Sequence, residues 1–86
     1  MVRNTPPIKN GYTIYTISDC KYCNLVKTQI NTNIKEVNCD VFITTLRERD
    51  KFYKYIHKYT IIKYIHFPMI FKDSKFIGGY KEFISN

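Results

Sequence analysis

A pair of cysteines at the junction of two differently patterned segments is the strongest constraint on the fold of this 86-residue chain. Residues 12–17 are β-rich and nearly all apolar, as expected of a strand that is covered on both faces. Cys20 and Cys23 follow this run and open a segment with apolar residues at helical spacing. Free N–H groups and the dipole at a helix start favour a thiolate, more for Cys20 than for Cys23. A C-x-x-C motif beside a strand–helix pattern is typical of a redox-active dithiol.

Two other interpretations of the cysteine pair stay open. It could supply half of a zinc site, for which Cys39, His57 and His66 are the remaining, scattered candidate ligands. It could also be a purely structural disulfide, although three cysteines, an odd number, do not make the framework of a small secreted protein. Cys39 falls on the apolar side of its predicted strand, so we expect it to be a buried small hydrophobe.

Length and charge limit the possible classes of function. The length suits one domain with a modest core, and we expect an N-terminal extension at residues 1–10 before a domain at residues 11–86. No apolar run approaches the length of a membrane span, and the first residues lack the apolar core of a secretory signal. We therefore expect a reducing, cytoplasmic location and no membrane partner. The net charge of +7 is spread singly along the chain without a nucleic-acid motif, so we expect a solvated basic surface rather than a nucleic-acid partner.

The pattern of apolar residues predicts the element order β-α-β-α-β-β-α. Ser18 or Asp19 can cap the first helix, and Thr44 or Thr45 can begin the second, which would run to about residue 59. Alternating residues 36–41 predict a strand, and residues 67–71 and 75–77 predict a hairpin before a short last helix at 80–86. Residues 59–66 show no clean period. The predicted inner face of the first helix comprises Tyr22, Leu25, Val26 and Ile30, and that of the second comprises Leu46, Phe52 or Tyr53, and Ile56.

Three segments in this order resemble the landmarks of the glutaredoxins of the dithiol class. The first is Ile14-Tyr15-Thr16 leading into Cys20-Lys21-Tyr22-Cys23. The second is Phe67-Pro68-Met69-Ile70-Phe71, which is similar to the family's segment around a cis-proline. The third is Phe76-Ile77-Gly78-Gly79-Tyr80-Lys81-Glu82-Phe83, which is similar to its I-G-G-x-x-x-F segment. Ordinary thioredoxins typically carry tryptophan beside the C-x-x-C, and this chain has none.

The resemblance implies a thioredoxin-like α/β fold, with a four-stranded mixed sheet and helices on both faces. It implies glutathione-dependent thiol–disulfide exchange in which Cys20 attacks and Cys23 resolves the mixed disulfide. Glutathione would be the reducing co-substrate, and Lys54, Lys58 or Lys63 could reach its glycine carboxylate. The residues expected to bind glutathione are Tyr22, Phe67, Pro68, Gly79, Tyr80 and Lys81.

Each landmark also has a physical role of its own. A cis Phe67–Pro68 bond leaves the preceding backbone free to pair with an extended cysteinyl peptide, whereas a trans proline would merely start an edge strand. Gly78 and Gly79 permit close backbone approach, and the N–H groups that follow can hold a carboxylate; a simple tight turn is the alternative.

The chain departs from the family at several positions near the expected site. Ile17 stands where a basic residue is frequent, and the charge of Asp19 opposes a thiolate at Cys20, for which Lys21 could compensate. His66-Phe67 replaces Thr-Val, and Lys81-Glu82 replaces the acidic residues after Gly-Gly. For His66 we expect a solvated residue at the site edge, with a proton-donor role as the alternative.

Two other functions stay open beside this expectation. One is a thioredoxin-like electron donor to ribonucleotide reductase that is reduced by a flavin enzyme. The other is a non-enzymatic iron–sulfur or zinc carrier, for instance a dimer with a 2Fe–2S cluster held by two Cys20 thiolates and two glutathiones. We expect a monomer without a resident metal that acts on disulfide-containing proteins.

Overall fold

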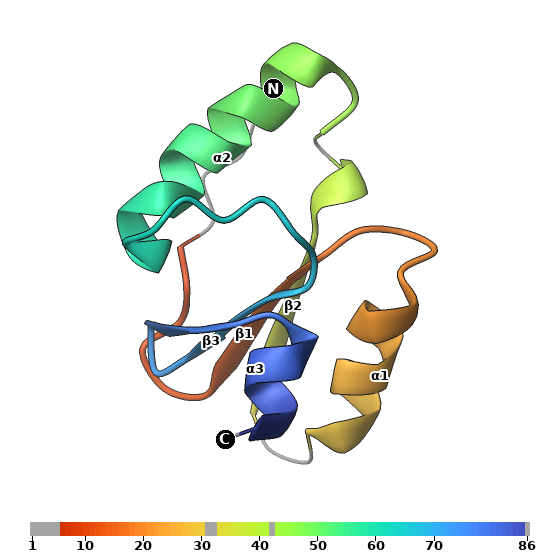
Figure 1. Ribbon diagram of the computed structural model, residues 1–86, viewed down its shortest axis with the longest axis vertical. Helices are drawn as coiled ribbons and strands as arrows, with labels where there is room; N and C mark the ends of the chain where they lie inside the picture. The colour runs from red at the N-terminus through yellow and green to blue at the C-terminus, as the bar shows by residue number, and fades with distance from the viewer. Residues whose placement is uncertain (1–5, 31–32, 42, 86) are drawn as a thin grey trace.

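The structure, a computed structural model, describes residues 6–30, 33–41 and 43–85. Its elements confirm the predicted order and are arranged in layers (Figure 1). In chain order they are β1 (Tyr12–Thr16), α1 (Lys21–Gln29), β2 (Ile34–Asn38), the 3-10 turn η1 (Cys39–Val41), α2 (Leu46–Thr60), β3 (Met69–Lys72), β4 (Lys75–Gly78) and α3 (Tyr80–Ser85). No helix in these described ranges is long and apolar enough to cross a membrane.

One mixed sheet of four strands, in the order β2-β1-β3-β4, forms the centre of the molecule. β1 pairs with β2 in parallel, with Tyr12 opposite Ile34, and with β3 in antiparallel fashion. β4 returns antiparallel to β3 and closes the hairpin. α2 lies on one face of the sheet, and α1 and α3 lie together on the other (Figure 1). The expected four-stranded mixed sheet with helices on both faces is therefore confirmed.

The core consists of two clusters, one on each face of the sheet. Neighbouring residues of β1 point to opposite faces, because strand side chains alternate. Tyr15 packs with Phe52 and Ile56 of α2, whereas Ile14 packs with Val26 of α1. Both β1 residues are fully buried. The nearly continuous apolar run of β1 thus reflects its central, doubly covered position.

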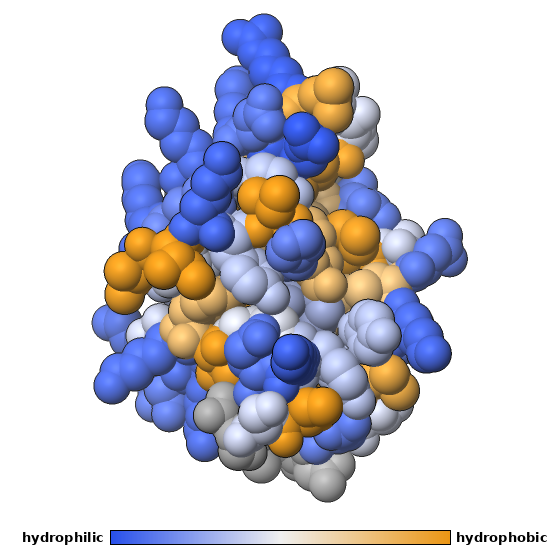
Figure 2. All heavy atoms as spheres, viewed as in Figure 1, coloured by the Kyte–Doolittle hydropathy of each residue, from blue (hydrophilic) through white to orange (hydrophobic). Residues whose placement is uncertain are grey.

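Two hydrogen bonds between side chains and backbone define the start of α2. The Thr45 hydroxyl accepts the Glu48 N–H at 3.2 Å, and a Glu48 carboxylate oxygen accepts the Thr44 N–H at 3.2 Å. Thr45 is the N-cap, as the sequence allowed. The helix ends at Thr60, and its C-cap Ile61 has a left-handed backbone (φ 72°) whose N–H donates to the His57 carbonyl at 3.2 Å. Figure 2 shows hydrophilic side chains projecting from the side of the molecule that carries α2.

Three residues predicted on the apolar face of a helix or strand are exposed. Leu46 is 69% exposed, because the first residue of α2 lies beyond the edge of the sheet-covered core. Val41 is exposed as well, because β2 begins at Ile34 and already ends at Asn38. There the Asn38 side chain accepts the Asp40 N–H at 3.0 Å, which turns the chain into η1 instead of continuing the strand. The third, Tyr22, belongs to the site described below.

Part of the predicted N-terminal extension packs on the domain. Pro7 is buried, and the Ile8 N–H donates to the Thr13 hydroxyl at 2.9 Å. Residues 1–5, 31–32, 42 and 86 lie outside the described residues.

Candidate active site

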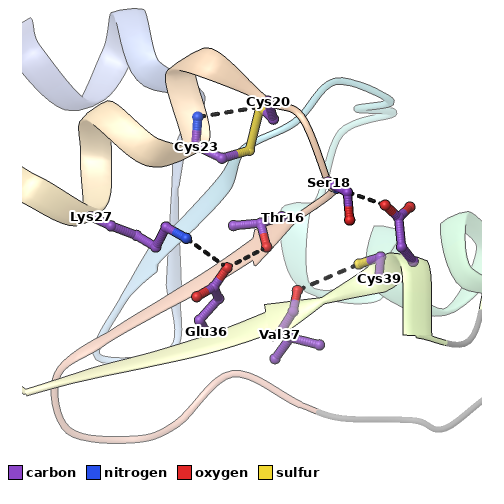
Figure 3. The surroundings of a disulfide bond; sticks show 9 residues. Thr16, Ser18, Cys20, Cys23, Lys27, Glu36, Val37 and Cys39 are labelled. Carbon is purple, nitrogen blue, oxygen red and sulfur yellow. Dashed lines mark hydrogen bonds and ion pairs between the residues drawn. A yellow bond between two sulfur atoms is a disulfide. The ribbon is translucent and has the colours of Figure 1, made fainter.

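The two cysteines of the C-x-x-C motif form a disulfide at the start of α1, with their Cα atoms 5.2 Å apart (Figure 3). Cys20 is the N-cap of the helix, and its Sγ accepts the Cys23 N–H at 3.2 Å. Cys23 lies inside the first turn and is 1% exposed, whereas Cys20 is partly exposed. The two sulfurs therefore differ in solvent exposure, and the N-cap sulfur of Cys20 accepts a hydrogen bond from a backbone N–H of the helix.

The predicted caps Ser18 and Asp19 are wrong, and the chain before the dithiol shows why. The Ser18 N–H donates to a carboxylate oxygen of Asp40 at 2.7 Å, which holds this loop to η1 (Figure 3). Hydrogen bonding from Ser18 keeps the pKa of the Asp40 carboxyl below its usual range. Asp19 has a left-handed backbone with φ 56°, so it forms a turn and the helix begins one residue later.

Glu36 of β2 fixes α1 to the sheet beside the dithiol. Its carboxylate accepts hydrogen bonds from the Thr16 hydroxyl at 2.8 Å and from the Lys27 ammonium at 3.1 Å (Figure 3). This contact joins β1, β2 and α1 through one side chain. It orients the helix whose first turn carries the cysteines.

A pocket of about 460 Å³ includes Tyr22 of the C-x-x-C motif in its lining but neither cysteine. It is bordered by Tyr22, which lies between the two cysteines in the sequence and whose ring centroid is 5.1 Å from that of Tyr80, with the two rings tilted by 32°. Tyr22 was predicted on the inner face of α1, but it is 51% exposed, because that part of the helix faces the pocket rather than the core. The lining residues are Tyr22, Tyr64, Phe67, Pro68, Gly79, Tyr80, Lys81, Glu82 and Ile84.

All six residues expected to bind glutathione line this one pocket, although they come from three separate segments. The Phe67–Pro68 bond is cis, which confirms that prediction. Pro68 is buried, and Phe67 stacks on Phe52 of the core at 6.2 Å. The expected proline segment and Gly-Gly segment therefore line the same cavity, together with Tyr22 from between the two cysteines.

Three lining residues were not expected from the sequence. Tyr64 comes from the loop after α2, where its ring packs on Phe76 at 5.1 Å and its backbone N–H donates to His57 Nε2 at 3.2 Å. No local sequence pattern predicts that Tyr64 lies in this pocket. Glu82 carried a usable signal, because an acidic residue three positions after a helix cap is the second half of a capping box. Ile84 is exposed at the pocket rim.

Other candidates lie outside the pocket. His66 is exposed and contacts the Tyr64 ring at 5.7 Å, and Lys54, Lys58 and Lys63 are exposed elsewhere. Cys39 is fully buried, as expected, and burial, followed by the nearby Asp40 carboxylate, raises the pKa of its thiol to about 12. Within residues 6–30, 33–41 and 43–85, the structure holds no group of three or more side chains suited to a metal ion.

Comparison with solved structures agrees with this architecture. Glutaredoxin 1 from Francisella tularensis, crystallised with cacodylate, is 30% identical, with a TM-score of 0.72 over 87% of this chain and 88% of its own. Glutaredoxin C1 from Populus tremula x tremuloides is 23% identical, with a TM-score of 0.67 over 88% of this chain and 72% of its own. A buckwheat glutaredoxin–glutathione complex is 20% identical, with a TM-score of 0.67 over 88% of this chain and 66% of its own. No protein-family model matches the sequence, and neither does any curated protein sequence.

The fold and the disulfide-forming pair define a thiol–disulfide oxidoreductase of the thioredoxin-like class. The match to the Francisella protein extends this from architecture to sequence over most of both chains. On that basis the chain belongs to the glutaredoxin family, and its C-x-x-C places it with the dithiol members.

Proposed function

We propose that the protein reduces protein disulfides and glutathione mixed disulfides with glutathione as the electron donor. The observation that carries this proposal is the arrangement of a partly exposed N-cap sulfur, a buried second sulfur and a pocket that joins the three landmark segments. The buckwheat relative, solved as a glutathione complex, supports it through a shared fold.

In the proposed reaction the Cys20 thiolate attacks one sulfur of the substrate disulfide. The substrate S–S bond breaks, its other sulfur leaves as a thiolate and takes a proton, and a mixed disulfide with Cys20 forms. Cys23 as thiolate then attacks the Cys20 sulfur, releases the second substrate thiol and closes the internal disulfide. Two glutathione molecules reduce that disulfide in turn and leave as oxidised glutathione.

The division of roles follows from access and hydrogen bonding. A substrate disulfide meets Cys20 first, because Cys23 is 1% exposed. The Cys23 N–H at 3.2 Å from the Cys20 sulfur, together with the helix dipole, stabilises negative charge there. When the substrate is a glutathione mixed disulfide, Cys20 retains the glutathione moiety and a second glutathione removes it, so one cysteine suffices.

The pocket holds the tripeptide in this proposal. Backbone groups of Phe67, Gly79 and Tyr80 bind its main chain and carboxylates, and Tyr22 and Lys81 border it. Which of the exposed lysines outside the pocket reaches the glycine carboxylate stays open. We further propose a cytoplasmic monomer, with ribonucleotide reductase among the candidate disulfide substrates.

The test is a glutathione-coupled assay on a small glutathione mixed disulfide and on a protein disulfide. Cys20→Ser should abolish both activities. Cys23→Ser should keep reduction of the mixed disulfide and lose reduction of the protein disulfide. If Cys23→Ser were as inactive as Cys20→Ser on the small substrate, the assigned roles would be wrong. Faster reduction by a thioredoxin reductase than by glutathione would favour the electron-donor alternative.

A further inference from the structure

The loop from α2 to the cis Phe67–Pro68 bond is attached to α2 at two consecutive residues (Figure 1). The Nε2 atom of His57 lies 3.0 Å from the Tyr64 carbonyl oxygen and 3.2 Å from the Tyr64 backbone nitrogen. The Tyr53 hydroxyl donates to the Ile65 carbonyl at 3.3 Å. His57 and Tyr53 are four residues apart, so they lie on the same side of the helix. One side of α2 therefore holds the backbone of the loop.

The His57 ring is held in place by its neighbour on the helix. Its plane is within 4° of that of Tyr53, with the ring centroids 6.1 Å apart, and both residues are partly buried. A neutral imidazole nitrogen is either a donor or an acceptor. Nε2 therefore bonds to the Tyr64 N–H in one tautomer and to the Tyr64 carbonyl in the other. Both neutral tautomers attach the same loop residue to α2.

Tyr64 lines the pocket although its backbone is attached to α2. Its ring packs on Phe76 of β4 with the centroids 5.1 Å apart. A Cβ atom on Gly79 would meet the Tyr64 hydroxyl, so this hydroxyl lies against the Gly-Gly turn. Phe67 and Pro68, three and four residues further along the chain, line the same pocket. A shift of the loop would therefore move Tyr64 and change the shape of the pocket.

We propose that His57 and Tyr53 are positioning residues, which keep Tyr64 in the place that lets the pocket bind glutathione. This inference rests on the proposed function. Neither His57 nor Tyr53 lines the pocket, so both act through the loop rather than by contact with the ligand. Their effect should therefore fall on glutathione binding and not on the reactivity of the Cys20 sulfur, which depends on the start of α1.

Two substitutions at His57 separate hydrogen bonding from packing. His57→Phe keeps an aromatic ring beside Tyr53 but has no ring nitrogen for the Tyr64 backbone. His57→Gln loses the ring, but its amide carries a donor and an acceptor that can bond to the same two backbone groups. If hydrogen bonding positions the loop, His57→Gln should behave like the wild type and His57→Phe should not.

A second pair of substitutions removes one hydroxyl from either side of α2. Tyr53→Phe keeps the ring that stacks on His57 but loses the hydrogen bond to Ile65. Tyr55→Phe is the matched control, because two residues along a helix correspond to a rotation of about 200°. Tyr55 pairs with Tyr59 instead and does not line the pocket.

The experiment follows two reactions of each reduced protein. The first is glutathione-coupled reduction of the cysteine–glutathione mixed disulfide, which gives kcat and the KM for the mixed disulfide. The second is alkylation of Cys20 by iodoacetamide, a small reagent that needs no pocket. His57→Phe should raise KM about fivefold, the effect of one net hydrogen bond, with kcat and the alkylation rate within about twofold of the wild type. Tyr53→Phe should raise KM in the same direction, and His57→Gln and Tyr55→Phe should leave it within about twofold.

The inference is wrong if His57→Phe leaves KM unchanged while the wild-type protein is active. It is also wrong if His57→Gln is as impaired as His57→Phe, which would assign the role to ring packing. Equal effects of Tyr53→Phe and Tyr55→Phe would overturn it too, and this pair decides alone if His57→Phe fails to fold. A fall in Cys20 alkylation that matches the rise in KM would place the effect at the dithiol and not at the loop. Wild-type protein that reduces the mixed disulfide no faster than a free thiol would instead refute the proposed function, and this inference with it.

Discussion

Cys39 should resist alkylation in the folded, reduced protein by a large and calculable factor. Its side chain is 0% exposed in the cluster that contains Tyr15 and Phe52. Burial, followed by the Asp40 carboxylate, raises the pKa of the thiol from 9.0 to about 12. Each pKa unit lowers the thiolate population tenfold at a pH well below the pKa, so at pH 8 Cys39 has roughly 1,000-fold less thiolate than an ordinary cysteine.

The assay is iodoacetamide labelling of reduced protein at pH 8, with peptide mass spectrometry to follow each cysteine separately. A short unstructured cysteine peptide in the same tube serves as the reference thiol. Cys39 should react at least about 1,000-fold more slowly than this reference, because the packing that raises its pKa also excludes the reagent. Unfolding in guanidinium chloride should bring its rate to that of the reference.

Labelling of Cys39 within tenfold of the reference rate in the folded protein would refute this reasoning. It would mean that the segment from β2 to η1 opens readily, or that the thiol lies closer to solvent than its surroundings indicate. Cys39→Ala provides the control, since labelling of Cys20 should be unchanged in that variant. The outcome also decides whether Cys39 is accessible as an alternative resolving thiol.

Three further predictions concern stability. Cys39 and Tyr15 have folded-state pKa values raised by burial, so their stabilising contribution is complete below the unfolded pKa and is lost as pH rises. The free energy of unfolding in urea should therefore fall by about 1.4 kcal/mol per pH unit above about pH 9 for Cys39 and above about pH 10 for Tyr15. The fall should be less steep in Cys39→Ala, and a flat profile would contradict the prediction. Phe52→Ala should cost about 3–5 kcal/mol, because Phe52 contacts Tyr15 and Phe67 in the core, and a loss below about 1 kcal/mol in urea unfolding would exclude that role. Ile61→Gly should gain about 0.5–1 kcal/mol in the same assay, because Ile61 is 88% exposed with φ 72°, and a loss would show that its side chain packs.

Local sequence patterns predicted the elements well but not the extent of the core. Thr44 or Thr45 was predicted to begin the second helix, because both residue types cap helices, and Thr45 is its N-cap. Leu46 was placed inside by helical periodicity, which gives the direction of a side chain but not whether anything covers it. At the first residue of α2 nothing does, and Leu46 is exposed. Whether a face is covered depends on distant packing, which no local window contains.

The candidate site shows the same difference between residues in local motifs and residues placed by distant packing. The six residues predicted around the dithiol, the proline and the Gly-Gly turn all line one pocket, and each belongs to a short motif. Glu82 and Ile84, which follow the same turn, were not predicted. Tyr64 was missed, because a contact between its backbone and His57 and a ring contact with Phe76 bring it to the pocket. These contacts join the loop after α2 to the end of that helix and to β4. Residues 59–66, which show no clean apolar period, therefore contribute Tyr64 to the pocket lining.

Overall charge and local charge act on different parts of the substrate in this protein. The net charge of +7 attracts anions at long range and so speeds encounter. In the pocket lined by Tyr22 the local charges are nearly balanced, since Lys81 and Glu82 line it with opposite charges. The Gly79 N–H in the pocket wall is bonded to Glu82. A substrate whose negative charge lies far from its reacting sulfur benefits from the long-range attraction without bringing that charge into the pocket. We therefore expect an acidic protein disulfide to react faster than an uncharged one, and added salt to reduce the difference between the two rates.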